Sequence, residues 1–102
     1  MLDKFIIDIN INKLSKQQFK EIVSEKSLEC KATILEYLKK FPCSAFTSAP
    51  VIDIFTDKEV KVADNGYSDG EYIWYESEIY YFEKYNLKLN NDFIEYVLEK
   101  VR

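Results

Sequence analysis

Closely spaced carboxylates are the side chains of this 102-residue sequence that come nearest to a catalytic arrangement. Glu76 with Glu78, and Asp69 with Glu71, are the two pairs in question. Two carboxylates can serve as general acid and general base when their surroundings separate their pKa values. Acids two apart in a loop or a first helical turn are far more often solvated, and the chain has no histidine to act as a base. A carboxylate-only enzyme is therefore a minor alternative.

Other reactive sites are disfavoured by composition. Cys30 and Cys43 are too few for a disulfide scaffold, and their spacing fits no zinc motif. Cys43 also has no local base to ionise its thiol. Two isolated glycines cannot form a phosphate-binding loop. We therefore expect a protein that is not an enzyme, with no metal, no cofactor, and two reduced thiols as in the cytoplasm.

Charge is distributed unevenly along the chain. Residues 1–41 hold eight lysines and six acids, whereas residues 42–102 hold six basic and twelve acidic residues. Residues 53–78 alone contain eight acids and two lysines, so this segment accounts for the acidic character of the chain. The same segment also contains three tyrosines and the only tryptophan of the chain: Tyr67, Tyr72, Tyr75 and Trp74.

Acids interleaved with aromatic residues are typical of a surface that binds a basic protein. Carboxylates would steer the encounter, and large aromatic rings would supply buried contact area. The predicted binding residues are Asp57, Glu59, Asp64, Asp69 and Glu71 for charge pairing, with Tyr67, Tyr72 and Tyr75 as aromatic anchors. In the competing interpretation the acids solvate a loop and the aromatic rings point inward. Trp74 in particular is expected in the core.

Nucleic acids and membranes are not expected partners. The sequence has no basic stripe of the kind that binds phosphate backbones. No apolar run approaches the roughly 20 residues of a membrane span. Asp3 and Asp8 interrupt the apolar N-terminus, which is unlike a signal peptide. We expect a cytoplasmic protein that is a monomer when free, since its short apolar stripes give no coiled-coil signal.

The length predicts a single globular domain over residues 1–102. Phe5, Ile7, Ile9 and Ile11 alternate with mostly polar neighbours, which predicts an N-terminal strand, although Ile6 also permits a short buried helix. Ser15 and Gln18 have the form of a capping box, which predicts a helix start. A second helix, capped by Ser27 and ended by Pro42, is predicted by one apolar stripe: Cys30, Ile34, Tyr37, Leu38 and Phe41.

The C-terminal half mixes strand, turn and helix signals. Residues 43–49 predict a packed connection, and residues 51–55 and 60–62 a short hairpin. Turn signals at residues 65–66 and 69–70 favour a looped excursion, followed by a brief strand at 72–74. Helices are predicted over 76–85 and, after a cap at Asn90 or Asn91, along a stripe formed by Ile94, Val97, Leu98 and Val101. The fold class is therefore α+β, with about four helices and a small antiparallel β element, or mostly α without the N-terminal strand.

The stretch from Asp69 to Phe93 resembles a known group of proteins. It reads DGEYIWYESEIYYFEKYNLKLNNDF: Asp-Gly, an aromatic-Ile-Trp element, a Tyr-rich helix, an extended apolar link and a short final helix. This order resembles small bacterial immunity proteins of polymorphic toxin systems, including contact-dependent growth inhibition. The likeness covers the C-terminal third and departs from the pattern at Tyr75 and Asn90, where proline is expected.

The resemblance implies a protein that binds and neutralises a cognate toxin domain stoichiometrically. Toxins of that kind are frequently basic nucleases, which an acidic inhibitor would match by charge. The principal alternative is a small acidic adaptor or regulatory domain that binds a protein unrelated to any toxin. Genome context separates the two, since the toxin hypothesis requires a neighbouring upstream gene for a large secreted protein with a variable C-terminal domain.

Overall fold

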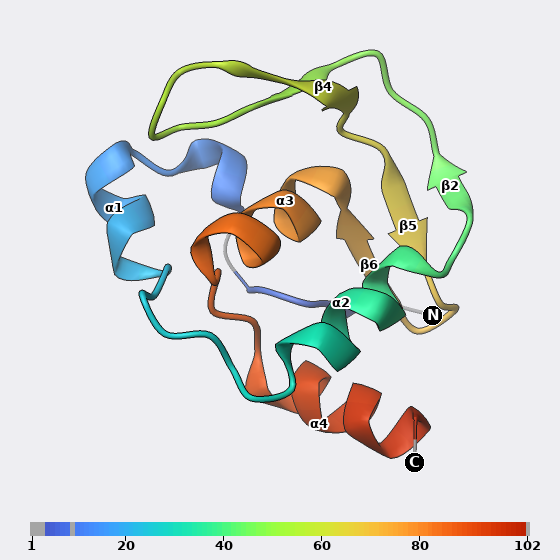
Figure 1. The fold of residues 1–102 in the computed structure, drawn as a ribbon. Helices are drawn as coiled ribbons and strands as arrows, with labels where there is room; N and C mark the ends of the chain where they lie inside the picture. Colours follow the sequence, from blue (N-terminus) through green and yellow to red (C-terminus); the bar gives the residue numbers. More distant parts are fainter. Residues whose placement is uncertain (1–3, 9, 102) are drawn as a thin grey trace.

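The computed structural model describes residues 4–8 and 10–101, which form four α-helices and two β-sheets (Figure 1). The elements along the chain are β1 (Lys4–Phe5), a 3-10 turn (Ile11–Lys13), α1 (Lys16–Glu21), α2 (Lys31–Lys39), β2 (Cys43–Ala45), β3 (Pro50–Ile52), β4 (Glu59–Ala63), β5 (Gly66–Ser68), β6 (Tyr72–Tyr75), α3 (Glu76–Tyr85) and α4 (Asn91–Lys100). In the part of the chain that is described, no helix combines the length and apolarity needed to cross a bilayer.

The larger sheet has the strand order β1-β6-β5-β2. β1 runs parallel to β6, whereas β6–β5 and β5–β2 are antiparallel. The second sheet is the antiparallel β3–β4 hairpin, as the sequence predicts. Figure 1 shows α3 near the centre, with the hairpin above it and α2 and α4 below it. This arrangement confirms the predicted α+β class.

Trp74 lies at the centre of the core, with no exposed surface. Its indole Nε1 donates a hydrogen bond of 3.2 Å to the carbonyl oxygen of Leu38, in the last turn of α2. The rings of Phe41 and Phe93 lie within 6.2 Å of the Trp74 ring, between centroids. The indole therefore ties β6 to α2 and α4, and the expectation that Trp74 is a core residue is confirmed.

Replacing Trp74 with phenylalanine should lower the free energy of unfolding by about 2 kcal/mol, because the smaller ring leaves a cavity and the Leu38 carbonyl loses its donor. Urea denaturation measures this loss. Phe46→Leu is the matched control, since Phe46 is 85% exposed and its replacement should change stability by less than about 0.5 kcal/mol. Equal stability of the two variants would contradict the role given to the indole.

The predicted N-terminal strand is much shorter than expected. β1 ends at Phe5, and both Ile6 and Ile7 are buried, so the chain does not keep the alternation of a strand. Ile11 is buried at the start of the 3-10 turn, and Ile9 lies outside the described residues. The apolar residues here pack into the core from an irregular segment, which their periodicity could not distinguish from a strand.

The second helix begins later than predicted, at Lys31, and its N-cap is Cys30. The Ser27 hydroxyl instead donates to Asn86 Oδ1, at the C-terminus of α3. Ile34, Tyr37 and Leu38 of the predicted stripe are buried. The apolar face was therefore predicted correctly, but the cap was misplaced because a serine side chain can bond a distant partner as readily as its own helix.

The two turn signals enclose a strand and not a looped excursion. β5 occupies residues between them and pairs with β6 in a tight hairpin. Gly70 has a φ of +99°, as its turn requires, but Gly66 has no positive φ. A Cβ on Gly66 would lie 3.2 Å from Ala45 Cβ and 3.3 Å from the Tyr75 ring, so this glycine allows close packing within the sheet.

Two further predictions need correction. Residues 43–49 do not form a packed connection, because β2 is an edge strand and residues 44–50 are exposed. Asn90, one of the two predicted candidates, is the N-cap residue of α4, but its side chain makes no capping hydrogen bond. The buried residues of α4 are Phe93 and Val97, while Val101 is 47% exposed. The true inward face is rotated toward Phe93, whose ring contacts Tyr72 and Trp74.

Candidate functional site

Asp69, a predicted surface charge, is an internal acceptor in the β5–β6 turn. Its Oδ2 accepts hydrogen bonds from the hydroxyls of Tyr37 (2.5 Å) and Tyr96 (2.8 Å). Its Oδ1 accepts from the backbone N–H groups of Glu71 and Tyr72. Burial opposes ionisation, but these four donors outweigh it and hold the Asp69 pKa below its usual value. This carboxylate therefore fastens the turn to α2 and α4.

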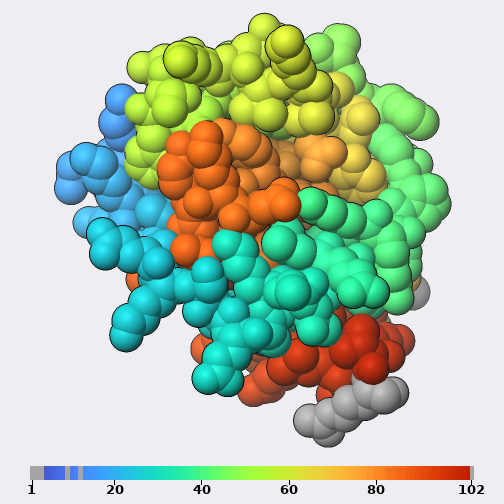
Figure 2. All heavy atoms as spheres, in the orientation of Figure 1, coloured from blue at the N-terminus to red at the C-terminus, as the bar shows by residue number. Residues whose placement is uncertain are grey.

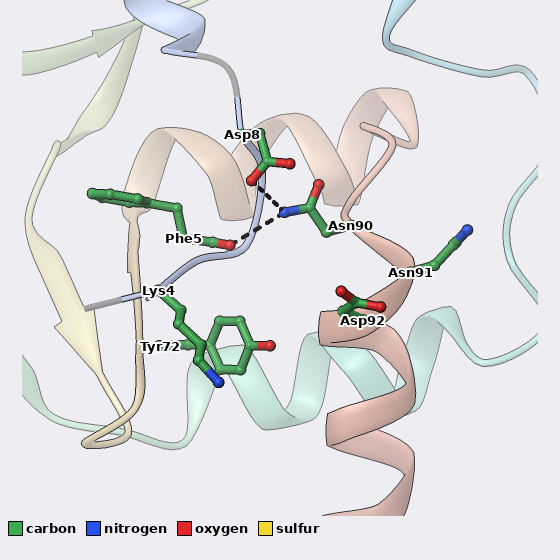
Figure 3. A pocket seen from close by; sticks show the side chains of 7 residues that line it. All are labelled: Lys4, Phe5, Asp8, Tyr72, Asn90, Asn91 and Asp92. Atoms are coloured by element: carbon green, nitrogen blue, oxygen red, sulfur yellow. Dashed lines mark hydrogen bonds between the residues drawn. The ribbon is translucent and has the colours of Figure 1, made fainter. Parts of the chain in front are cut away.

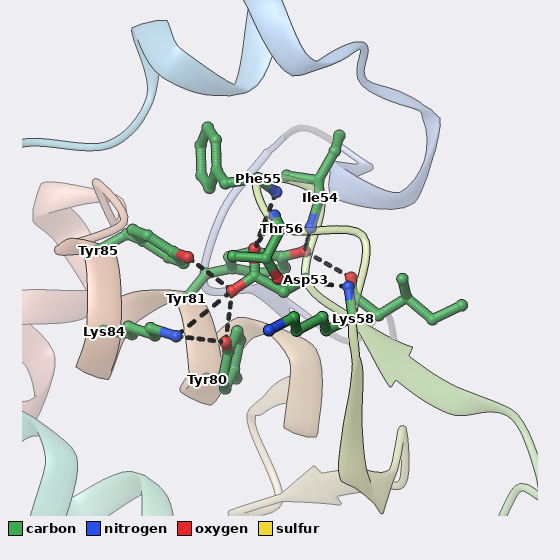
Figure 4. A network of polar contacts seen from close by, with 10 residues as sticks. Asp53, Ile54, Phe55, Thr56, Lys58, Tyr80, Tyr81, Lys84 and Tyr85 are labelled. Atoms are coloured by element: carbon green, nitrogen blue, oxygen red, sulfur yellow. Dashed lines mark hydrogen bonds and ion pairs between the residues drawn. The ribbon is translucent and has the colours of Figure 1, made fainter.

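Asp53 is also an internal hydrogen-bond acceptor, at the β3–β4 hairpin, and Figure 4 shows its contacts. Its carboxylate is 1% exposed and accepts from the hydroxyls of Tyr80 (2.5 Å) and Tyr85 (2.6 Å) on α3. The backbone N–H groups of Phe55 and Thr56 also donate to it. Here too the hydrogen bonds outweigh burial and lower the pKa of the carboxyl group. We call this set of contacts the hairpin clamp.

Two more predicted binding residues are partly occupied by internal hydrogen bonds. Asp64 is half-buried and accepts from the backbone N–H of Ser77, in the first turn of α3. The hydroxyl of Tyr67 donates to Glu76 Oε1 at 3.1 Å. Burial and the Glu76 carboxylate raise the pKa of Tyr67 to about 12, so this hydroxyl stays a donor at neutral pH.

The remaining predicted residues do not gather on one surface. Asp57 and Glu59 are exposed at the hairpin, Glu71 is exposed in the β5–β6 turn, and Tyr75 is 37% exposed. Figure 1 shows the tip of the hairpin and the β5–β6 turn on opposite sides of the molecule. Tyr72 is only 6% exposed, so its use as a surface anchor was a wrong expectation. The inward-facing interpretation holds for Tyr72 and Trp74.

An acidic and aromatic groove lies instead beside α3. It has a volume of about 320 Å³ between α3, β4, β5 and α2, and we call it the α3 groove. Its lining residues are Leu38, Lys39, Val60, Val62, Tyr67, Glu76, Ile79, Tyr80 and Glu83. Figure 2 shows this face of α3 at the surface, between the hairpin above and α2 below.

Glu76, Tyr80 and Glu83 stand on one face of α3, because they follow the i, i+4, i+7 spacing of a helix. Glu76 is held by Tyr67, and Glu83 pairs with Lys39 at 3.0 Å in an exposed ion pair. Such a pair contributes little stability and exchanges readily with a competing cation. Of these residues the sequence predicted only Tyr67 for partner binding. Glu76 was considered only as half of a catalytic pair, although the helical spacing of Glu76, Tyr80 and Glu83 was a usable signal.

In the described part of the chain, the side chains of the two predicted carboxylate pairs are engaged with other partners. Glu78 is buried and accepts from the Tyr75 N–H, whereas its supposed partner Glu76 bonds Tyr67. Glu71 forms an ion pair with Lys4, away from the internal bonds of Asp69. Among the described residues, no three His, Cys, Asp or Glu side chains are placed to hold a metal ion.

A second hollow lies where β1 meets the start of α4, and Figure 3 shows its lining. It has a volume of about 510 Å³. Asn90 Nδ2 donates to the Phe5 carbonyl oxygen (3.3 Å) and to Asp8 Oδ1 (3.0 Å), which joins the segment after β1 to the N-terminus of α4. Lys4 and Asp92 add opposite charges to the lining, so this hollow favours neither a positively nor a negatively charged ligand.

Comparisons with known proteins supply no function for this chain, so a functional assignment rests on its geometry. No family model matches the chain, and neither a curated protein nor a solved structure matches it.

Proposed function

We propose that the chain is an immunity protein that binds and neutralises a cognate toxin domain, with the α3 groove as the centre of the contact. The observation that carries this proposal is the placement of Glu76 and Glu83 on one face of α3, with Tyr67 and Tyr80 beside them. Carboxylates next to aromatic rings match a basic protein surface. In this proposal the chain acts in the cytoplasm, without catalysis of its own, and is a monomer when free.

The groove has the chemistry to receive an arginine or lysine from the partner. The aliphatic stem of such a side chain would lie along Val60 and Val62, which face the groove from β4. Its charged end would reach Glu76 or displace Lys39 from Glu83. Tyr80 would provide a ring face for a cation–π contact, as it already does for Lys84, whose Nζ lies 5.6 Å from the ring centroid.

The direct test is co-purification with the C-terminal domain encoded by the upstream neighbouring gene, at low and then moderate salt. We expect a tight complex that forms faster at low salt, because opposite charges steer association. Absence of a complex, together with absence of a toxin-like neighbour, would overturn the immunity proposal. The same groove would then be assigned to a small acidic adaptor.

Reversal of the groove charges should weaken the complex by roughly 10- to 100-fold, because two carboxylates that attract a basic surface become repulsive. The variant is Glu76→Lys combined with Glu83→Lys, and the measurement is the dissociation constant by calorimetry. Glu71→Lys is the matched control, since it reverses an exposed carboxylate in the β5–β6 turn. If the control loses as much affinity as the groove variant, the α3 groove is not the contact.

A further inference from the structure

A third pocket opens behind the sheet, at the start of α3, and is independent of the toxin-binding proposal. It has a volume of about 430 Å³, within the range of pockets that hold small organic ligands. Its lining residues are Phe5, Ile7, Asp8, Asn10, Ile11, Tyr75, Ser77 and Glu78. We call it the Phe5–Tyr75 pocket, after its two exposed rings.

Sheet register places those two rings on the same side. Phe5 of β1 pairs with Ile73 of β6, and Tyr75 follows Ile73 by two residues. Side chains two apart on a strand share a face, so Phe5 and Tyr75 lie opposite the core face that carries Tyr72 and Trp74. In Figure 3 the Phe5 ring accordingly points away from Asn90 and Asp92. Phe5 is 53% exposed and Tyr75 37%, so both present apolar surface to a ligand.

Ser77 gives the pocket a polar group in need of a partner. The residue is 3% exposed, and its Oγ is buried without a hydrogen bond among the described residues. An unpaired buried hydroxyl costs about 1–3 kcal/mol, so native structures rarely leave one unused. A ligand group that reached this oxygen would supply the missing bond.

Glu78 and Asp8 make the pocket electronegative. Glu78 is 5% exposed and uses Oε1 to accept the Tyr75 N–H at 2.8 Å, which leaves Oε2 as an acceptor. Asp8 is exposed at the other wall. The lining contains no lysine or arginine to neutralise either carboxylate. Burial, reinforced by the nearby Asp64 carboxylate, raises the pKa of Glu78 to about 7, so a bound cation would relieve an unfavourable charge.

We propose that the Phe5–Tyr75 pocket binds a small aromatic amine, with its ammonium group at Glu78 and its ring against Phe5 and Tyr75. Ile7 and Ile11, both 6% exposed, form the apolar base beneath such a ring. Carboxylate, hydroxyl and aromatic groups together recognise an ammonium by charge-assisted hydrogen bonds and cation–π contact. An anionic or purely apolar ligand would leave the buried carboxylate unpaired.

Tryptamine is the probe, titrated into ¹⁵N-labelled protein near pH 7.5 and followed by amide chemical shifts. We expect saturable shifts at Tyr75, Ser77 and Glu78, with a dissociation constant below about 1 mM. Tryptophol, which replaces the ammonium with a hydroxyl, should bind at least about tenfold more weakly. Glu78→Gln should reduce tryptamine binding to the level of tryptophol, because it keeps the shape and the bond to the Tyr75 N–H but removes the charge.

Glu83→Lys separates this pocket from the α3 groove. It should leave tryptamine affinity unchanged, because Glu83 lines the groove and not the pocket. The proposal is overturned if tryptamine gives no saturable shifts, if tryptophol binds as well as tryptamine, or if the shifts map to residues of the groove.

Discussion

The variant Asp53→Ala is expected to lose roughly 3–5 kcal/mol in the free energy of unfolding, because four donors lose one charged acceptor. The Asp53 carboxylate is 1% exposed, so water cannot easily replace it. Tyr80 and Tyr85 would keep their hydroxyls without the acceptor that now aligns them (Figure 4). Urea denaturation at pH 7 measures the loss.

Two controls distinguish the hairpin clamp from a general effect of charge removal. Glu59→Ala removes an exposed carboxylate from the same hairpin and should change stability by less than about 0.5 kcal/mol. Tyr85→Phe removes one donor and should cost about 1–2 kcal/mol. A loss below about 1 kcal/mol in Asp53→Ala would contradict the clamp, since a single ordinary hydrogen bond accounts for that much.

The clamp also determines the shape of the α3 groove. β4 supplies one wall of the groove, and Asp53 connects the hairpin to α3. Tyr81 adds a second connection, since its hydroxyl donates to the Ile52 carbonyl and accepts from the Ile54 N–H. Stability and partner binding should therefore decline together in Asp53→Ala. The charge reversals in the groove should weaken binding with a smaller loss of stability, since the Tyr67–Glu76 hydrogen bond is the one part-buried contact among the described residues that they remove.

Local signals in the sequence predicted most of the helices. The capping box at Ser15 and Gln18 forms as expected, and the helix over 76–85 has the predicted bounds. Both depend on residues within a few positions of one another. The N-terminal strand was predicted too long, because β1 is limited to the two residues that pair with β6, nearly 70 residues away, and no local pattern reports such a partner.

The acidic surface was only partly predictable, because the hydrogen-bond partners of its acids are also distant in the sequence. A core of this size cannot provide acceptors for many buried tyrosines unless charged groups turn inward, and Asp53 and Asp69 do so. The tyrosines that they bind lie 27 to 32 residues away in the sequence, beyond the reach of spacing rules. In a Tyr-rich domain the sequence therefore cannot distinguish an acidic residue that binds a partner from one that accepts hydrogen bonds from buried tyrosines.

Glu78 caps the start of α3 and is at the same time a buried carboxyl group. As the third residue of α3 it accepts the Tyr75 N–H, which is the usual function of a glutamate in a capping box. It differs from most such residues in being 5% exposed, and burial raises its pKa from 4.5 to about 7. Asp53 and Asp69 have lowered pKa values, so their contributions change only in more acidic solution.

The folded protein should therefore become less stable as pH rises from about 4.5 to about 7, by about 3 kcal/mol from Glu78 alone. In this window the folded state keeps the Glu78 proton and the unfolded state releases it, so each added pH unit favours unfolding. Above about pH 7 both states are ionised and the effect levels off. Glu78→Gln should remove this dependence, because its amide has no proton to lose. Urea denaturation from pH 5 to pH 8 tests this, and parallel stability curves for the two proteins would show that burial does not hold the Glu78 proton.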